Sequence, residues 1–206
     1  MALSPSGMAS ANRDESLFAE RLQLSDVHVE RSRRTRISQG DVFRDVECIE
    51  YAVEKRGIIE VSKIVFPLVI VLTQDCDLEQ DSNNRGKETQ GTKLLSVLVV
   101  PLYNAEHVFQ GEHLVDIGVK MAPISKGRTP GRNLMQNESP RYHYIDFPGD
   151  VPLVASVADF KHYFSVHVSS LEKIRKTNFV CRLSDLFKED LSQRFAGYLA
   201  RIGLPT

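Results

Sequence analysis

The sequence predicts a mainly β protein with some α structure: one small barrel domain, closed by a C-terminal helix and preceded by a short helical extension. Three observations predict it. Short apolar, strand-like segments recur between polar or glycine-containing segments. One long amphipathic helical pattern occurs, at residues 185–202. The 206 residues contain neither an internal repeat nor a break in composition that would indicate a second domain. We therefore assign residues 1–37 to the extension and residues 38–206 to the barrel domain.

The N-terminal extension has three parts. Residues 1–13 are small and polar, which predicts a disordered start. Residues 14–24 predict a short helix, because their leucines and Phe18 recur on one broad face. Residues 30–36 form a basic linker with four arginines. Arginines at this density can hold phosphates, and a solvated connector is an equally good interpretation.

The barrel strands are predicted from apolar runs and from the alternation of apolar and polar residues. Residues 67–73 are apolar on both faces, which predicts a buried central strand, and residues 94–101 predict another. The other strands are expected at 40–49, 57–65, 113–120, 141–147, 153–157 and 162–168. Two segments rich in polar residues, glycine or proline are expected to be exposed loops, at 81–92 and 121–140.

Two helices are expected after the strands. Residues 171–176 predict a short one. Residues 185–202 carry apolar side chains at steps of three and four, which is typical of a helix that buries one face. Ser184 can cap its start, and Gly203 can end it.

Composition and charge set limits on the function. With 42% hydrophobic and 26% charged residues, the chain has the proportions of a globular protein. The formal net charge of -1 neither requires nor excludes a nucleic-acid partner, since a local basic patch suffices. Three cysteines without a framework spacing indicate a reducing compartment. The chain shows no signal-peptide pattern, and its longest apolar run is too short for a bilayer, so we expect a cytoplasmic protein without a membrane partner.

A polar segment that directly follows the central strand is the first candidate site. Cys76 can act as a nucleophile if a base such as His143 or His162 lies nearby. Asp75 and Asp77, with Glu79, can instead bind a hard cation such as magnesium. In a third interpretation the two aspartates cap turns and Cys76 packs inward. In a fourth, the segment from Gln74 onward contacts a polar substrate.

The second candidate site runs from the 121–140 loop into the next strand. Arginines hold phosphate, amides read base edges and tyrosine rings stack on unpaired bases, which makes this segment a candidate nucleic-acid surface. His143 is its best acid or base, because an unperturbed histidine titrates near neutral pH. Alternation along a strand, however, places the tyrosines on the face opposite to Arg141 and His143. An equally good interpretation is therefore that the tyrosines belong to the core and that Arg141 and His143 form a solvated face without a binding role. The residues concerned are Arg128, Arg132, Gln136, Asn137, Arg141, Tyr142, His143 and Tyr144.

A third group combines Asp159, Lys161, His162 and His167. Two histidines five residues apart make a poor zinc signal without a third ligand. Asp159 with Lys161 is commonly a surface ion pair of little energetic value.

The order of the segments resembles the PemK/MazF-like toxin family of SH3-like barrels. Gly40-Asp41-Val42-Phe43 is similar to the opening of that family's first strand, and residues 67–73 are similar to its proline-led strand that ends in Ser or Thr. Residues 94–101 resemble the next strand, which also ends in valine and proline. The late stretch 157–161, followed by 182–184 and the closing helix, resembles the family's C-terminal part.

The resemblance implies a metal-independent endoribonuclease that cleaves single-stranded RNA, pairs as a homodimer, needs no cofactor and belongs to a toxin or phage-defence system with an antitoxin-like partner. It places Thr73 at a phosphate oxygen and Asp159 and Lys161 against the substrate. The family has an arginine directly before the strand proline, where this chain has Phe66. Two alternatives therefore stay open: a non-catalytic binding module for nucleic acid or protein, and a metal-dependent hydrolase around Asp75 and Asp77.

Overall fold

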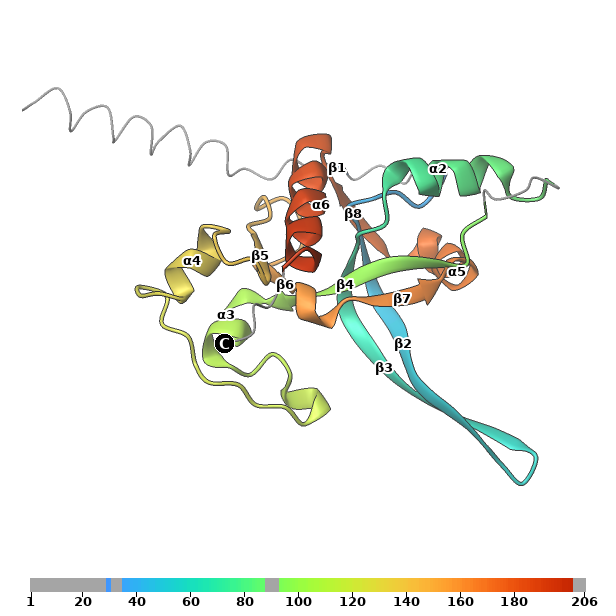
Figure 1. Ribbon diagram of the computed structural model, residues 1–206, viewed down its shortest axis with the longest axis horizontal. Coiled ribbons are helices and arrows are strands. Elements are labelled where there is room, and N and C mark those ends of the chain that lie inside the picture. Colours follow the sequence, from blue (N-terminus) through green and yellow to red (C-terminus); the bar gives the residue numbers. More distant parts are fainter. Residues whose placement is uncertain (1–28, 31–34, 88–92, 202–206) are drawn as a thin grey trace, which may run out of the picture.

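The computed structural model describes residues 29–30, 35–87 and 93–201. The helix expected at residues 14–24 lies outside these ranges, as does most of the basic linker. The described residues form eight strands, five α-helices and two 3-10 helices (Figure 1). The strands are β1 (Val29–Glu30), β2 (Asp41–Lys55), β3 (Ile58–Val71), β4 (Ser96–Asn104), β5 (Tyr142–Ile145), β6 (Ser156–Asp159), β7 (Phe164–His167) and β8 (Phe179–Leu183). The helices are α2 (Asp75–Asn84), α3 (Ala105–Gln110), η1 (Val115–Ile117), α4 (Gly131–Met135), η2 (Phe160–His162), α5 (Val168–Asn178) and α6 (Asp185–Leu199).

The strands form one curled, antiparallel sheet in the order β1-β8-β2-β3-β4-β6-β5. Strand β4 is the branch point, because β3 pairs with one of its edges while β7 and then β6 pair with the other. The sheet has the shape of a half-barrel, and within the described ranges no pairing joins its end strands β1 and β5. The molecule is therefore a mixed α/β protein on a curled antiparallel sheet, with the expected C-terminal helix.

The body of the sheet is covered on both faces. On one face α6 packs Leu191 and Phe195 against Ile70 and Leu102 of the two central strands, with Phe160 beside them. The other face carries a second core, to which α2 and α5 contribute Leu78 and Leu171. This double burial explains the continuous apolar sequence of the central strands. A third core lies under α3 and α4, over β5 and β6.

The hairpin of β2 and β3 extends far beyond the other described strands (Figure 1). It begins where Asp45 (φ 54°) lies opposite Pro67, which has no N–H to donate to the ladder. Beyond this point the two strands pair only with each other in the part of the chain that the structure describes. We call residues 46–66 the β-arm.

Several predicted elements are wrong in detail. Helix α2 occupies Asp75–Asn84, so it includes the polar segment after the central strand and the first residues of the loop expected at 81–92. The weak strand expected at 113–120 is absent, and the 3-10 helix η1 occurs there instead. The loop at 121–140 contains the short helix α4. Within the described residues, none of the helices combines the length and the hydropathy needed to span a bilayer.

Candidate functional site

Asp159 is the centre of the candidate site. It is the last residue of β6, and the register pairs it with Tyr142 of β5. Its carboxylate accepts the backbone N–H of Lys161 at 3.0 Å and so caps the 3-10 helix η2. The residue is 1% exposed. A carboxylate buried to this degree needs a cationic partner.

Arg141 supplies the positive charge. Its Nε donates to Oδ1 of Asp159 at 2.8 Å, and its Nη2 donates to Oδ2 at 2.5 Å. This two-point geometry matches the planar guanidinium to the carboxylate. The hydrogen bonds that Arg141 donates to the Asp159 carboxylate raise the pKa of Arg141 above its usual value, and the guanidinium also lies 4.9 Å from the centre of the Tyr142 ring. The pair is therefore fixed in one orientation at the edge of the sheet.

Two histidines and a tyrosine complete the site. The hydroxyl of Tyr103, on β4, lies 3.1 Å from Nδ1 of His162, and the same nitrogen lies 3.5 Å from Oδ2 of Asp159. The ring of His113 meets the Tyr103 ring edge-on, with centroids 4.9 Å apart. Tyr103 faces this site because the register pairs it with Val157, two residues before Asp159. We call Tyr103, His113, Arg141, Asp159, Lys161 and His162 the Asp159 cluster.

Burial sets the protonation states in the Asp159 cluster. It lowers the pKa of His162 and of His113, and the nearby Asp159 carboxylate opposes that shift in both. Burial and the same carboxylate raise the pKa of the Tyr103 hydroxyl. At neutral pH both imidazoles are therefore uncharged, and the tyrosine keeps its proton.

This arrangement offers a base, a cation and hydrogen-bond donors. Nδ1 of His162 is engaged by Tyr103 and Asp159, whereas its Nε2 has no hydrogen-bond partner among the described residues. Neither ring nitrogen of His113 makes a hydrogen bond of standard geometry, although the carbonyl of His107 lies near enough to raise its pKa. Lys161 is exposed beside the pair. A neutral imidazole, oriented through its other nitrogen, is the usual form of a histidine base.

The structure thus brings Arg141, Asp159 and Lys161 together but places Thr73 elsewhere. The Thr73 hydroxyl accepts the backbone N–H of Leu98 at 2.7 Å, which extends the β3–β4 pairing. Strands β3 and β6 lie on opposite edges of β4, so Thr73 and Asp159 are at least about 10 Å apart across the sheet. Gln74 is exposed and directly precedes α2.

His143 lies inside the core rather than at the surface. It is 3% exposed and stacks on Phe160, and Tyr142 and Tyr144 lie on the opposite face, as alternation predicts. Burial, aided by the charge of Arg194, lowers the pKa of His143 to about 3. A neutral, enclosed imidazole does not reach an external substrate, so this placement gives its predicted catalytic role no support.

Of the residues predicted to contact nucleic acid, Asn137 is hydrogen-bonded within the fold, whereas Arg128 and Arg132 are exposed. The Asn137 side chain bonds both the N–H and the carbonyl of Tyr144, at 2.7 and 3.0 Å, so its amide serves the fold. Arg128 and Arg132 are exposed and lie one helical turn apart, because the N–H of Arg132 donates to the carbonyl of Arg128. These two arginines remain free to meet solvent or a ligand.

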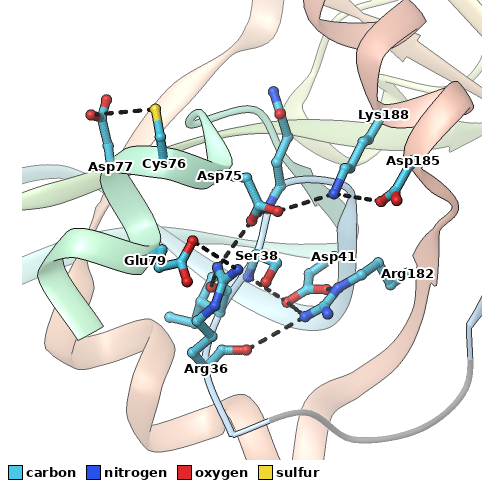
Figure 2. A network of polar contacts seen from close by, with 12 residues as sticks. Arg36, Ser38, Asp41, Asp75, Cys76, Asp77, Glu79, Arg182, Asp185 and Lys188 are labelled. Carbon is cyan, nitrogen blue, oxygen red and sulfur yellow. Dashed lines mark hydrogen bonds and ion pairs between the residues drawn. The ribbon is translucent and has the colours of Figure 1, made fainter. Parts of the chain in front are cut away.

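The segment after the central strand forms a charged network (Figure 2). Asp75 accepts from Arg36 and from Lys188, at 3.0 Å each, and from the backbone N–H of Gln39. Burial works against its charge, but Lys188 and Arg36 prevail and lower the pKa of Asp75 to about 2. Beside it, Arg182 forms a buried ion pair with Asp41. The network ties residues 36–41 to α2, β8 and α6, which indicates a structural role for Asp75.

Cys76 and Asp77 point away from Arg36 and Lys188 (Figure 2). The Cys76 thiol is exposed and contacts Gln74 and Asp77, so it does not pack inward as one interpretation held. Across the described ranges, His, Cys, Asp and Glu side chains nowhere gather in threes in a way that could hold a metal ion. Asp75, moreover, already accepts hydrogen bonds from the cationic side chains of Arg36 and Lys188.

Sequence reasoning missed Tyr103 and His113. Both lie in segments that carried no site signal, and His113 fell within a predicted strand that does not form. Only the pairing of β4 with β6 brings Tyr103 next to residues more than fifty positions away. No protein-family model matches the chain, and no curated protein matches its sequence.

Proposed function

We propose that the protein is a nucleic-acid-directed effector of toxin or phage-defence type, and that it cleaves single-stranded RNA without a metal ion at the Asp159 cluster. The observation that carries this proposal is His162, a neutral imidazole held through Nδ1 by Tyr103 and Asp159, with Nε2 open and Lys161 beside it. The curled antiparallel sheet and the C-terminal helix are compatible with the PemK/MazF-like, SH3-like barrel that the sequence resembles.

In the proposed reaction, Nε2 of His162 takes the proton from a ribose 2′-hydroxyl. The 2′-oxygen attacks the adjacent phosphorus and displaces the 5′-oxygen, which leaves a 2′,3′-cyclic phosphate. Lys161 and the remaining N–H groups of Arg141 stabilise the charge on the phosphate oxygens. The expelled 5′-oxygen takes a proton from water. The Tyr103 hydroxyl, which stays protonated, fixes the imidazole during the step.

The test is incubation of the purified protein with single-stranded RNA in EDTA. We expect cleavage products that end in a 2′,3′-cyclic phosphate. His162→Ala is expected to lower the rate by about 10²–10⁴-fold, the usual contribution of a general base. His167→Asn is the matched control, because His167 is exposed and caps α5, and asparagine can keep that cap. Absence of cleavage at every protein concentration, with a native circular dichroism spectrum, would remove the proposal.

One observation favours a second function, a non-catalytic binding module. Phe66, which stands where the related toxins have an arginine, packs on Phe164 with ring centroids 5.1 Å apart. No guanidinium can act there. RNA binding that weakens with salt but gives no cleavage would support this second function over the first.

A further inference from the structure

An aromatic surface lies beside the Asp159 cluster, where the 3-10 helix η2 packs on the C-terminal half of α6. Phe160, the first residue of η2, is buried and packs on Phe195 and Tyr198, with ring centroids 5.4 and 5.9 Å apart. The ring of Tyr163, directly after η2, meets the Phe195 ring edge to face at 5.3 Å. These ring contacts fix η2 and α6 relative to each other, and with them the side chains that both elements expose here.

Tyr163 presents its ring to solvent at this surface. The residue is 41% exposed, and it directly follows His162, the proposed base. Among the described residues the other exposed tyrosine is Tyr51, at 59%, which lies on the β-arm. A ring that is held by one packed contact and is otherwise accessible provides a platform on which an unpaired base can stack.

Cationic side chains border the aromatic surface. Lys161 is exposed, and Arg201 places its guanidinium 4.0 Å from the centre of the Tyr198 ring. Neither of these two side chains has a carboxylate within ion-pair distance among the residues that the structure describes. The pKa of Arg141 is raised chiefly by the hydrogen bonds it donates to Asp159, and Tyr198 lies near enough to add to that shift. The surface is therefore continuous with the Asp159 cluster, and two of its cations are not matched by an acid.

We propose that Tyr163, Tyr198, Lys161 and Arg201 form a stacking subsite, in which Tyr163 stacks on an unpaired base while Lys161 and Arg201 bind the phosphates next to it. The proposal rests on the nucleic-acid-directed function proposed above, and it adds the feature of the substrate that is recognised. A base reaches the Tyr163 ring only when it is outside a duplex, so the subsite selects single strands. Every base has a π face, so the subsite has little sequence preference.

The test is the binding of a fluorescein-labelled, single-stranded DNA of roughly ten nucleotides by the full chain, measured by fluorescence anisotropy. DNA has no 2′-hydroxyl, so the proposed reaction cannot consume it, and binding is measured separately from cleavage. Tyr163→Leu keeps an apolar side chain on Phe195 but has no ring, and it should weaken binding about 5- to 150-fold. Tyr163→Phe keeps the ring and should bind like the wild type. Tyr51→Leu, the matched control on the β-arm, should also bind like the wild type.

Two further measurements make the test specific to the subsite. A DNA duplex of the same sequence should bind more weakly than the single strand, and Tyr163→Leu should leave its binding unchanged, because paired bases cannot stack on the ring. Arg201→Gln leaves every ring in place. It should make the salt dependence of single-strand binding less steep by about 0.7, whereas Arg56→Gln at the tip of the β-arm should leave it unchanged.

The outcomes separate the subsite from the cleavage reaction. A Tyr163→Leu variant that is folded and binds the single strand as tightly as the wild type would overturn the subsite, as would equal affinity for the duplex. If that variant fails to fold, an unchanged salt dependence in Arg201→Gln would overturn it instead. Cleavage of RNA by a protein that does not bind single-stranded DNA would support the reaction and contradict the subsite. Binding that depends on the Tyr163 ring, without cleavage of RNA, would do the reverse.

Discussion

At the residue scale, the Arg141–Asp159 pair differs from the ion pairs on the surface. Asp159 is buried and receives two hydrogen bonds from one guanidinium. Arg141→Ala would leave this carboxylate buried without a partner, so we expect the free energy of unfolding to fall by about 3–5 kcal/mol. Urea denaturation measures the change. Lys55→Ala removes the partner of exposed Glu60 and should change the same quantity by less than about 1 kcal/mol. Equal losses in the two variants would contradict this account.

His143 gives the stability a pH dependence. The native state holds this histidine neutral, with a pKa of about 3, whereas the unfolded chain binds a proton below pH 6.5. The unfolded state therefore binds more protons, and stability should fall as the pH falls from about 6.5 to about 4.5, by up to about 1.4 kcal/mol per pH unit from this site. The contribution of Asp75, whose pKa is about 2, is lost only at lower pH.

The variant His143→Gln isolates this contribution, because glutamine does not titrate. The slope of unfolding free energy against pH should be smaller in the variant than in the wild type over this range. His113 and His162 keep their own contributions in both proteins, so the difference reports His143 alone. Identical slopes would contradict the burial of a neutral imidazole at this position.

The sequence allowed part of the candidate site to be predicted. Asp159, Lys161 and Arg141 were named in advance, the first two from the family resemblance and the third from a basic segment that leads into a strand. Thr73 and His143 were named for their residue type and position, but a hydroxyl at a strand end also completes sheet pairing, and a histidine on a strand can face the core. Only the three-dimensional register separates these outcomes.

At the scale of single elements, α6 depends on one buried stripe. Leu191 is fully buried against the sheet, whereas Leu186 on the same helix is 61% exposed. Leu191→Ala is expected to lower the unfolding free energy by about 2–5 kcal/mol through lost burial and the cavity left behind. Leu186→Ala should change it by less than about 0.5 kcal/mol, as is usual for surface positions. Thermal and urea denaturation of both variants measure the contrast, and similar losses would show that α6 does not pack as described.

Helix α6 was predictable and α2 was not, for a physical reason. The apolar period of α6 is visible in its sequence. Helix α2 buries only Leu78 and Asp81, and the buried Asp81 is satisfied by Arg85 and by the backbone N–H of Leu94. A helix held by polar contacts to distant residues shows no apolar period in its sequence, so its sequence pattern predicts a loop.

At the scale of the whole molecule, a net charge of -1 provides no long-range attraction for RNA. Binding through the Asp159 cluster should then involve few phosphates. The logarithm of the binding constant should fall with the logarithm of salt concentration with a slope of roughly −1 to −3, at about −0.7 for each phosphate contact. Fluorescence anisotropy across a potassium chloride series measures it. Lys161→Ala should reduce the steepness by about 0.7, and a slope beyond about −5 would indicate a broad basic surface instead.

The single strand-rich unit, the succession of most strands and the closing helix were all predictable from the sequence, because local patterns encode them. The length of the β-arm was not. The strands expected at 57–65 and 67–73 are one continuous strand that passes through Pro67, and its outer half, which is largely exposed, still carries Ile58, Ile59, Val61 and Ile64. Local pattern cannot distinguish apolar residues that fill a core from apolar residues that face solvent.

The pairing of β8 with both β1 and β2 determines when this protein can finish folding on the ribosome. The ion pair of Arg182 with Asp41 joins residues 141 positions apart. Until β8 emerges from the exit tunnel, the nascent chain keeps β2 uncovered along this edge, while the neighbouring β-arm can already form as a local hairpin. Translation therefore exposes the apolar side chains of the β-arm to solvent well before the body of the sheet is complete.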